Sequence, residues 1–251
     1  MANYENQPAR YGSSAAGAVG VIDEGLRAYM LRVYNYMLMG LALTGVFALG
    51  TFNLAFQSTA TGYQLTALGQ TLFGSPLMWL IILAPLGMVF FMSFRIQKMS
   101  VGAAQMAFWI FAALMGISLS TIFAAYTTTS ITQVFFITAA TFGAMSLWGY
   151  TTKRDLTGMG SFLFMGLIGI IIAMLVNIFL QSSALQFAVS VIGVLIFTGL
   201  TAYDTQKIKE MYYVGDDSTV AGRKAIMGAL SLYLDFINLF LMLLRLFGNR
   251  N

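Results

Sequence analysis

Two aspartates lie within the last two long apolar stretches of the chain, Asp204 in GLTAYDTQKIK and Asp235 in SLYLDFINLF. Almost every other charged residue lies between the apolar stretches rather than inside them. An ionisable side chain at membrane depth is energetically unfavourable, and such residues commonly mark ion pathways or proton relays. This pair is therefore the first indication of what the protein does.

Two carboxylates that lie close together in a medium of low dielectric rarely ionise together, so Asp204 and Asp235 are expected to titrate as a unit. While they share a proton, they can latch two helices together. As a dianion, they repel each other and attract a cation. Calcium suits carboxylates but takes roughly six to eight oxygen ligands. The pair therefore predicts transient calcium binding, completed by backbone carbonyls, Tyr203, Asn238 or water. The alternative is that the aspartates are only structural hydrogen-bonding groups, or that Asp204 simply lies at the membrane interface.

The composition requires lipid as the main solvent of this chain. Of its 251 residues, 59% are hydrophobic and only 9% are charged, whereas a soluble domain carries about 25% charged residues. The absence of cysteine excludes disulfides and thiolate chemistry, and the absence of histidine removes the usual switch near neutral pH. The net charge of +4 is interpreted as basic loops rather than nucleic-acid affinity, and nothing in the sequence indicates a bound cofactor.

Seven continuous apolar runs are each close to the roughly 20 residues that a membrane-spanning helix needs. They predict an all-α polytopic membrane protein, since a membrane β-barrel would show alternating strands of about ten residues. Residues 1–22 are polar and predict a disordered cytoplasmic tail without a signal peptide, followed by a membrane domain over 23–251 whose first helix Asp23 can cap. The predicted spans are Val33–Phe56, Leu77–Phe94, Ala103–Tyr126, Ile131–Tyr150, Ser161–Leu180, Leu185–Tyr203 and Ile226–Phe247.

The distribution of Lys and Arg predicts the orientation of these spans. With a cytoplasmic N-terminus, nearly all basic residues fall inside, and the three loops expected outside carry no charge. Seven spans then place the C-terminus outside. Arg245 and Arg250 at that end disagree with the rule, so a re-entrant last segment with a cytoplasmic C-terminus remains an alternative.

The last two spans form an antiparallel hairpin in which Asp204 and Asp235 are equally far from Thr219 and Val220. Residues equidistant from the turn of such a hairpin lie at similar depth, so both carboxylates are expected near the cytoplasmic side of the membrane. The spacing does not define which way either side chain faces.

An intramembrane aspartyl protease also places two aspartates on neighbouring spans. Tyr203-Asp204 matches the first motif of that class, Tyr-Asp. The second motif, Gly-x-Gly-Asp, is replaced here by Leu232-Tyr233-Leu234-Asp235, and no Pro-Ala-Leu follows. A retinal protein is disfavoured because no lysine lies inside a span to form a Schiff base. The sequence therefore favours a protein that is not an enzyme.

Three longer segments resemble the Bax inhibitor family (transmembrane Bax inhibitor motif proteins), and specifically its bacterial members. They are LRAYMLRVYNYMLMGLALTG (Leu26–Gly45), TFGAMSLWGYTTKRDLTGMGSFLFMGLIGI (Thr141–Ile170) and FTGLTAYDTQKIKEMY (Phe197–Tyr212) followed by LSLYLDFINLFLMLLRLFG (Leu230–Gly248). The similarity covers essentially the whole chain after the tail.

This resemblance implies a central last helix wrapped by the other six, in a multi-pass protein of the bacterial inner membrane. It also implies a pH-sensitive calcium leak that is closed by a paired-aspartate latch, and the pair corresponds to Asp204 and Asp235. A basic partner on the second helix corresponds to Arg95, whose alternative role is only to flank a span. The glutamate that the family carries on that helix is absent between Leu77 and Phe94. Some bacterial members resemble partners of a membrane-anchored AAA+ protease, which makes an interaction role through the N-terminal tail the second expectation.

Overall fold

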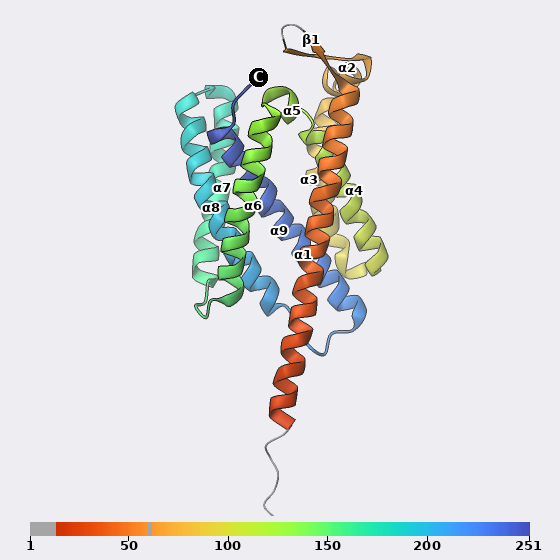
Figure 1. Cartoon of the computed structure of the whole chain (residues 1–251), viewed down its shortest axis with the longest axis vertical. Coiled ribbons are helices and arrows are strands. Elements are labelled where there is room, and N and C mark those ends of the chain that lie inside the picture. The colour runs from red at the N-terminus through yellow and green to blue at the C-terminus, as the bar shows by residue number, and fades with distance from the viewer. Residues whose placement is uncertain (1–13, 60–61) are drawn as a thin grey trace, which may run out of the picture.

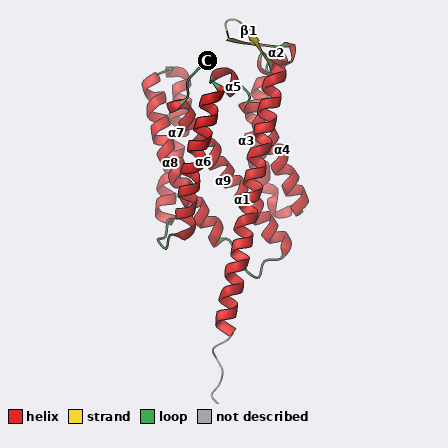
Figure 2. Cartoon of the chain, viewed as in Figure 1, coloured by secondary structure: helices red, strands yellow, loops and turns green. Residues whose placement is uncertain are grey.

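The computed structural model describes residues 14–59 and 62–251, with side chains from residue 24 onward. This part of the chain is almost entirely helical, with short loops and one small hairpin (Figure 2). Within it, seven helices are long and apolar enough to cross a membrane. The prediction of an all-α polytopic membrane protein with seven spans is therefore confirmed. In chain order, the spans are α1 (Ser14–Ala55), α3 (Leu77–Arg95), α4 (Val101–Leu119), α6 (Thr128–Thr151), α7 (Thr157–Leu180), α8 (Ser183–Glu210) and α9 (Ser218–Phe247).

Shorter elements join the spans. Strands β1 (Phe56–Thr59) and β2 (Gly62–Leu65) form an antiparallel hairpin after α1, and the short helix α2 (Ala67–Phe73) follows it. A 3-10 helix, Ile96–Lys98, extends α3, and the single turn α5 (Ile122–Ala125) precedes α6. The apolar runs alone did not predict the hairpin, which occupies an uncharged connection between two spans.

The spans form two groups of three helices that are joined by the last one (Figure 1). In one group α4 packs between α1 and α3, and in the other α8 packs between α6 and α7. Helix α9 runs obliquely between the groups and packs against α1 and α4 on one side and against α6 and α8 on the other. The tie between the two halves of the molecule is therefore mainly α9.

Helix α9 is also the most buried span. In its most apolar stretch, 72% of the residues are buried, compared with 11% in α3 and in α7 and at most 39% in the others. The apolar surface of α9 is thus covered by protein, whereas α3 and α7 present most of their surface to lipid. The expectation that the last helix is central and wrapped by all six other spans stays a prediction.

The two sides of the molecule differ in charge. We call the side on which α1 begins the basic side, because helix ends and loops there carry most of the described basic residues. The opposite side holds the β1–β2 hairpin, α5 and the C-terminus (Figure 1). The basic side carries Arg27, Arg32, Arg95, Lys98, Lys153, Arg154, Lys207, Lys209, Arg223 and Lys224.

Two helix starts differ from the sequence prediction. Helix α1 begins at Ser14, so Asp23 lies within the helix and the predicted boundary at residue 22 falls inside α1; residues 1–13 of the predicted tail lie outside the described residues. Helix α9 begins at Ser218, well before the predicted span that starts at Ile226, because the carboxylate of Asp217 accepts hydrogen bonds from the backbone N–H groups of Thr219 and Val220, both at 2.8 Å. An aspartate at this position satisfies N–H groups that the first helical turn leaves free.

The C-terminus is fixed on the side opposite the basic side. Helix α9 runs without interruption from Ser218 to Phe247, so its described residues contain no re-entrant turn. Beyond it, the backbone N–H of Asn249 donates to Ser130 Oγ at 3.0 Å, and the Asn251 amide donates to the carbonyl of Tyr126 at 3.1 Å. The two ends of the described chain therefore lie on opposite sides, as an odd number of spans requires.

A glycine permits close contact between α6 and α8. A Cβ atom at Gly149 would lie only 2.2 Å from the carbonyl oxygen of Ala202. A Cβ atom at Gly143, six residues earlier in α6, would meet nothing within 4 Å. Backbones that approach this closely gain van der Waals contacts, which drive association of helices in lipid. The contact therefore fixes the position of α8 at Ala202, two residues before Asp204.

We expect Gly149→Ala to destabilise the protein by about 1–3 kcal/mol, because the new methyl group must displace backbone rather than a flexible side chain. The matched control Gly143→Ala should be neutral or stabilising by up to about 1 kcal/mol, as alanine favours the helix. The midpoint of thermal unfolding in detergent measures both effects. Equal midpoints for the two variants would contradict the close contact.

Candidate functional site: a paired-aspartate cavity

Asp204 and Asp235 line the same cavity, which has a volume of about 760 Å³. Its walls come from α7, α8 and α9, and Leu86 of α3 closes part of its rim. Asp235 is buried, with 5% of its surface exposed, and Asp204 is half-buried. The structure thus brings together the two carboxylates that the sequence singled out.

Tyr233 determines the direction in which Asp235 points. The Tyr233 side chain is fully buried, its hydroxyl lies 2.7 Å from Thr44 Oγ1 of α1, and its ring packs edge-on against Phe111 of α4. Thr44 Oγ1 also donates to the Ala112 carbonyl of α4 at 2.9 Å. Two residues along a helix correspond to a rotation of about 200°. Because Tyr233 faces α1 and α4, Asp235 faces the other way, towards α7 and α8.

A second polar chain holds α8. Thr205 Oγ1 donates to the Thr201 carbonyl at 2.7 Å and lies 3.0 Å from Ser146 Oγ of α6. Ser146 Oγ in turn lies 2.5 Å from the Tyr34 hydroxyl of α1. These bonds connect α1, α6 and α8, and the residue of α8 that takes part, Thr205, directly follows Asp204 in the chain. They leave Asp204, about 100° further round the helix, facing the cavity.

The depth prediction for the pair agrees with how α8 and α9 pack. Gly193 lies against Met242, and Gly228 lies against Ile208. Both contacts and the aspartate pair are centred near the same point of the chain, close to Thr219. The loop itself covers residues 211–217, so the register is centred just after the loop rather than within it.

Both carboxyl groups line the cavity, and each acts electrostatically on the other. Asp235 Oδ2 is buried and has no hydrogen-bond partner among the described residues. A buried, unpartnered carboxylate oxygen is strongly unfavourable. The geometry therefore fits a shared proton between Asp204 and Asp235.

The basic residue that lines the cavity with the pair is Lys207, not Arg95. Lys207 lines the cavity one turn after Asp204 and acts electrostatically on that carboxylate. Its ammonium also lies 5.8 Å from the centre of the Tyr203 ring. Arg95 is exposed at the end of α3 and does not line the cavity. The i to i+3 spacing of Asp204 and Lys207 on one helix could have indicated this partner from the sequence.

Other oxygen atoms face the cavity beside the carboxylates. Asn238 and Ser231 line it from the same face of α9 as Asp235. The Asn238 amide nitrogen donates to the Leu234 carbonyl at 2.8 Å, which leaves its amide oxygen as an acceptor. Among the described residues, no group of three or more His, Cys, Asp and Glu side chains is arranged to hold a metal ion. The site thus offers hard oxygen ligands without a complete calcium cage.

A second cavity adjoins the first on the side opposite the basic side. It has a volume of about 390 Å³, and both cavities are lined by Ile171 and Met174 of α7. Arg245, near the end of α9, lines this second cavity, and one of its guanidinium nitrogens lies 3.7 Å from Met174 Sδ. The two cavities therefore adjoin along α7. Lys207 of α8 lines the first, and Arg245 of α9 lines the second.

The loop between α6 and α7 is attached to α8 one turn from the cavity. Gln206 accepts a hydrogen bond from the Leu156 backbone N–H and donates to the Arg154 carbonyl, both at 2.8 Å. In the same loop, hydrogen bonds from the side chain and backbone of Thr157 lower the pKa of the exposed Asp155. These contacts fix the start of α7, which forms one wall of the cavity.

We expect Tyr233→Phe to destabilise the protein by about 0.5–2 kcal/mol, because it removes an interhelical hydrogen bond inside the membrane. Thr44 keeps its bond to the Ala112 carbonyl, so the loss should stay in this range. Tyr63→Phe, at an exposed position in β2, is the matched control. A thermal midpoint for Tyr233→Phe that equals that of Tyr63→Phe would contradict a role for this hydroxyl in holding α9.

Residues 26–251 match the model of a protein family described as inhibitor of apoptosis-promoting Bax1. Among its relatives, the chain is 53% identical to protein RP147 of Rickettsia prowazekii over 91% of this chain and 92% of the relative. It is 50% identical to the inner membrane protein YbhL of Escherichia coli, over 90% of this chain and 93% of that protein. A protein of Caulobacter vibrioides is 44% identical over 90% of both chains.

Proposed function

The chain belongs to the Bax inhibitor family, and on this premise we propose that it is a pH-sensitive calcium or cation leak channel of the bacterial inner membrane. The observation that carries the proposal is the paired-aspartate cavity. Two carboxyl groups line one cavity between the spans, and Asp235 Oδ2 is buried without a hydrogen-bond partner in the part of the chain that the structure describes. Intramembrane carboxylates in a cavity are typical of ion paths.

The pair acts as a latch in this proposal. While one proton is shared, a hydrogen bond between Asp204 and Asp235 holds α8 against α9 and keeps the path closed. When both groups ionise, their repulsion loosens this contact, and the dianion attracts a cation from the basic side. The amide oxygen of Asn238, the Ser231 hydroxyl and water supplement the ligands. An incomplete site suits passage, because an ion must leave as readily as it binds.

The charge of the loops supports the orientation in this proposal. Basic residues concentrate on the side where α1 begins, and cytoplasmic loops are typically rich in Lys and Arg. The N-terminus is therefore assigned to the cytoplasm, with the aspartate cavity nearer that side. The adjoining cavity that Arg245 lines supplies the continuation of the path towards the opposite face.

We expect calcium flux into proteoliposomes to rise with pH between about pH 6 and pH 8, as the shared proton is lost. Asp204→Asn and Asp235→Asn should each abolish most of this dependence, because an amide cannot ionise. The double variant should be no worse than the stronger single one, because the two groups act as a coupled pair.

Asp217→Asn is the matched control for this experiment, because Asp217 caps α9 outside the cavity and asparagine is an equally good cap. Its flux should follow the wild type at every pH. Strict additivity of the two cavity variants, or wild-type flux no greater than in empty liposomes, would refute the latch.

Neutralising Lys207 provides an independent test of the charge beside the pair. Because its positive charge lines the same cavity as the pair and a nearby cation stabilises a carboxylate, we expect the half-maximal flux of Lys207→Gln to move to higher pH. Arg95→Gln removes the same charge from the same side of the molecule, outside the cavity, and should leave the midpoint unchanged. A shift in Arg95→Gln alone would restore Arg95 as the basic partner of the latch.

A second role, as a partner of a membrane-anchored AAA+ protease, stays a prediction. Its expected contact is the N-terminal tail, and residues 1–13 lie outside the described part of the chain.

A further inference from the structure

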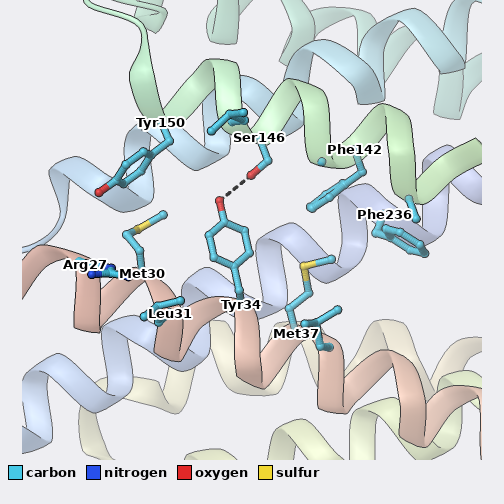
Figure 3. Close-up of a pocket in the computed structure, with 13 residues that line it drawn as sticks. Arg27, Met30, Leu31, Tyr34, Met37, Phe142, Ser146, Tyr150 and Phe236 are labelled. Atoms are coloured by element: carbon cyan, nitrogen blue, oxygen red, sulfur yellow. Dashed lines mark hydrogen bonds between the residues drawn. The ribbon is translucent and has the colours of Figure 1, made fainter. Parts of the chain in front are cut away.

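A groove separate from the aspartate cavity lies between α1 and α6. It has a volume of about 590 Å³, and Phe236 of α9 forms part of its lining. Figure 3 shows Arg27 and Tyr150 at one end of this groove and Met37, Phe142 and Phe236 at the other. The groove is thus polar at the basic side and apolar along the rest of its length.

One cation lines the polar end, and a second contacts Tyr150 from α8. Arg27 is exposed in the early turns of α1 and lines the groove. Lys209 of α8 donates to the Tyr150 carbonyl at 2.8 Å, and its ammonium lies 5.2 Å from the centre of the Tyr150 ring. The Tyr150 hydroxyl adds a hydrogen-bonding group at the same end of the groove as Arg27 (Figure 3). This end of the groove is therefore suited to an anionic group.

The body of the groove is built for hydrocarbon. Leu31, Leu38 and Leu147 line it and are 52%, 58% and 64% exposed, so the groove opens sideways, towards lipid. The Tyr34 hydroxyl forms a hydrogen bond with Ser146 across the groove (Figure 3). The polar groups within the body thus satisfy each other and leave an apolar surface.

We propose that this groove binds an anionic phospholipid, with its phosphate at Arg27 and one acyl chain along α1 and α6 towards Phe236. The charge distribution carries this assignment, because one cationic end and one apolar body match the headgroup and chain of such a lipid. Basic pockets between spans on the cytoplasmic side are known to bind anionic headgroups. The assignment rests on the lining of the groove and does not depend on the proposed ion path.

Lipid titrations of the full-length protein in detergent, followed by native mass spectrometry, test the site. Phosphatidylglycerol should bind the wild type more tightly than phosphatidylethanolamine. We expect Arg27→Gln to weaken phosphatidylglycerol binding about fivefold, the effect of one basic residue near a membrane surface. Arg32→Gln is the matched control, because Arg32 is exposed on the same helix outside this groove, and it should leave the affinity unchanged.

A filling variant tests the apolar part of the site. Gly143 lines the groove, and a side chain there would meet nothing within 4 Å of its Cβ atom. Gly143→Leu should therefore occupy the groove without a clash and weaken binding of both lipids. Gly169→Leu, at a similarly open and exposed position of α7, should not.

Three outcomes would overturn the proposal. Equal affinities of the wild type for the two lipids, unchanged in Arg27→Gln, would show that the groove does not select an anionic headgroup. Unaltered lipid binding in Gly143→Leu, with the variant monodisperse, would place the bound lipid elsewhere. A membrane protein that co-purifies with the wild type in place of lipid, and is lost in Gly143→Leu, would identify the occupant as another span. If Gly143→Leu fails to fold, the Arg27 and Arg32 pair still decides the question.

Discussion

A carboxylate in the apolar interior of a bilayer is stable only with a proton, a partner or water beside it, and this constraint shapes the core of the molecule. Asp235 lies on the span with the least surface available to lipid, so the surrounding helices keep hydrocarbon away from it. Asp204 lies opposite it, and a cavity large enough for water adjoins both. The oblique course of α9 between two helix groups therefore does more than connect them. It places an ionisable group where the protein, rather than the lipid, controls its surroundings.

Two polar contacts position the helices that carry the pair. Tyr233 and Thr44 fix the rotation of α9 against α1 and α4, while Ser146 and Thr205 fix α8 against α6. Both contacts are buried, and neither involves a charge. Hydrogen bonds between spans are modest in energy, but they are directional. They can therefore define which face of a helix points to the cavity, which packing of apolar side chains defines less strictly.

The sequence predicted what depends on local hydrophobicity and on distance along the chain. Seven apolar runs became seven spans, and the midpoint of Asp204 and Asp235, between Thr219 and Val220, agreed with the packing register of α8 and α9 to within about two residues. The direction of Asp235 was beyond prediction, because it depends on Thr44, 189 positions away from Tyr233 in the chain. The early start of α9 was missed because the span was placed from its apolar run, whereas the helix begins at its cap, Asp217. Arg95 was named because the resemblance implies a basic partner on the second helix, and Lys207, one turn from Asp204, was not considered for this role.

The α1–α6 groove and the aspartate cavity are connected through α8. The Tyr34 hydroxyl crosses the groove to Ser146, and Ser146 reaches Thr205, the residue after Asp204. Successive residues of a helix point about 100° apart. Thr205 is therefore hydrogen-bonded on the groove side of α8, while Asp204 faces the cavity. A molecule bound over Tyr34 would contact this chain of hydrogen bonds and would not touch the carboxylates. Any influence of the surrounding lipid on the pair would therefore act through the position of α8, and it would require no charged group to leave the cavity.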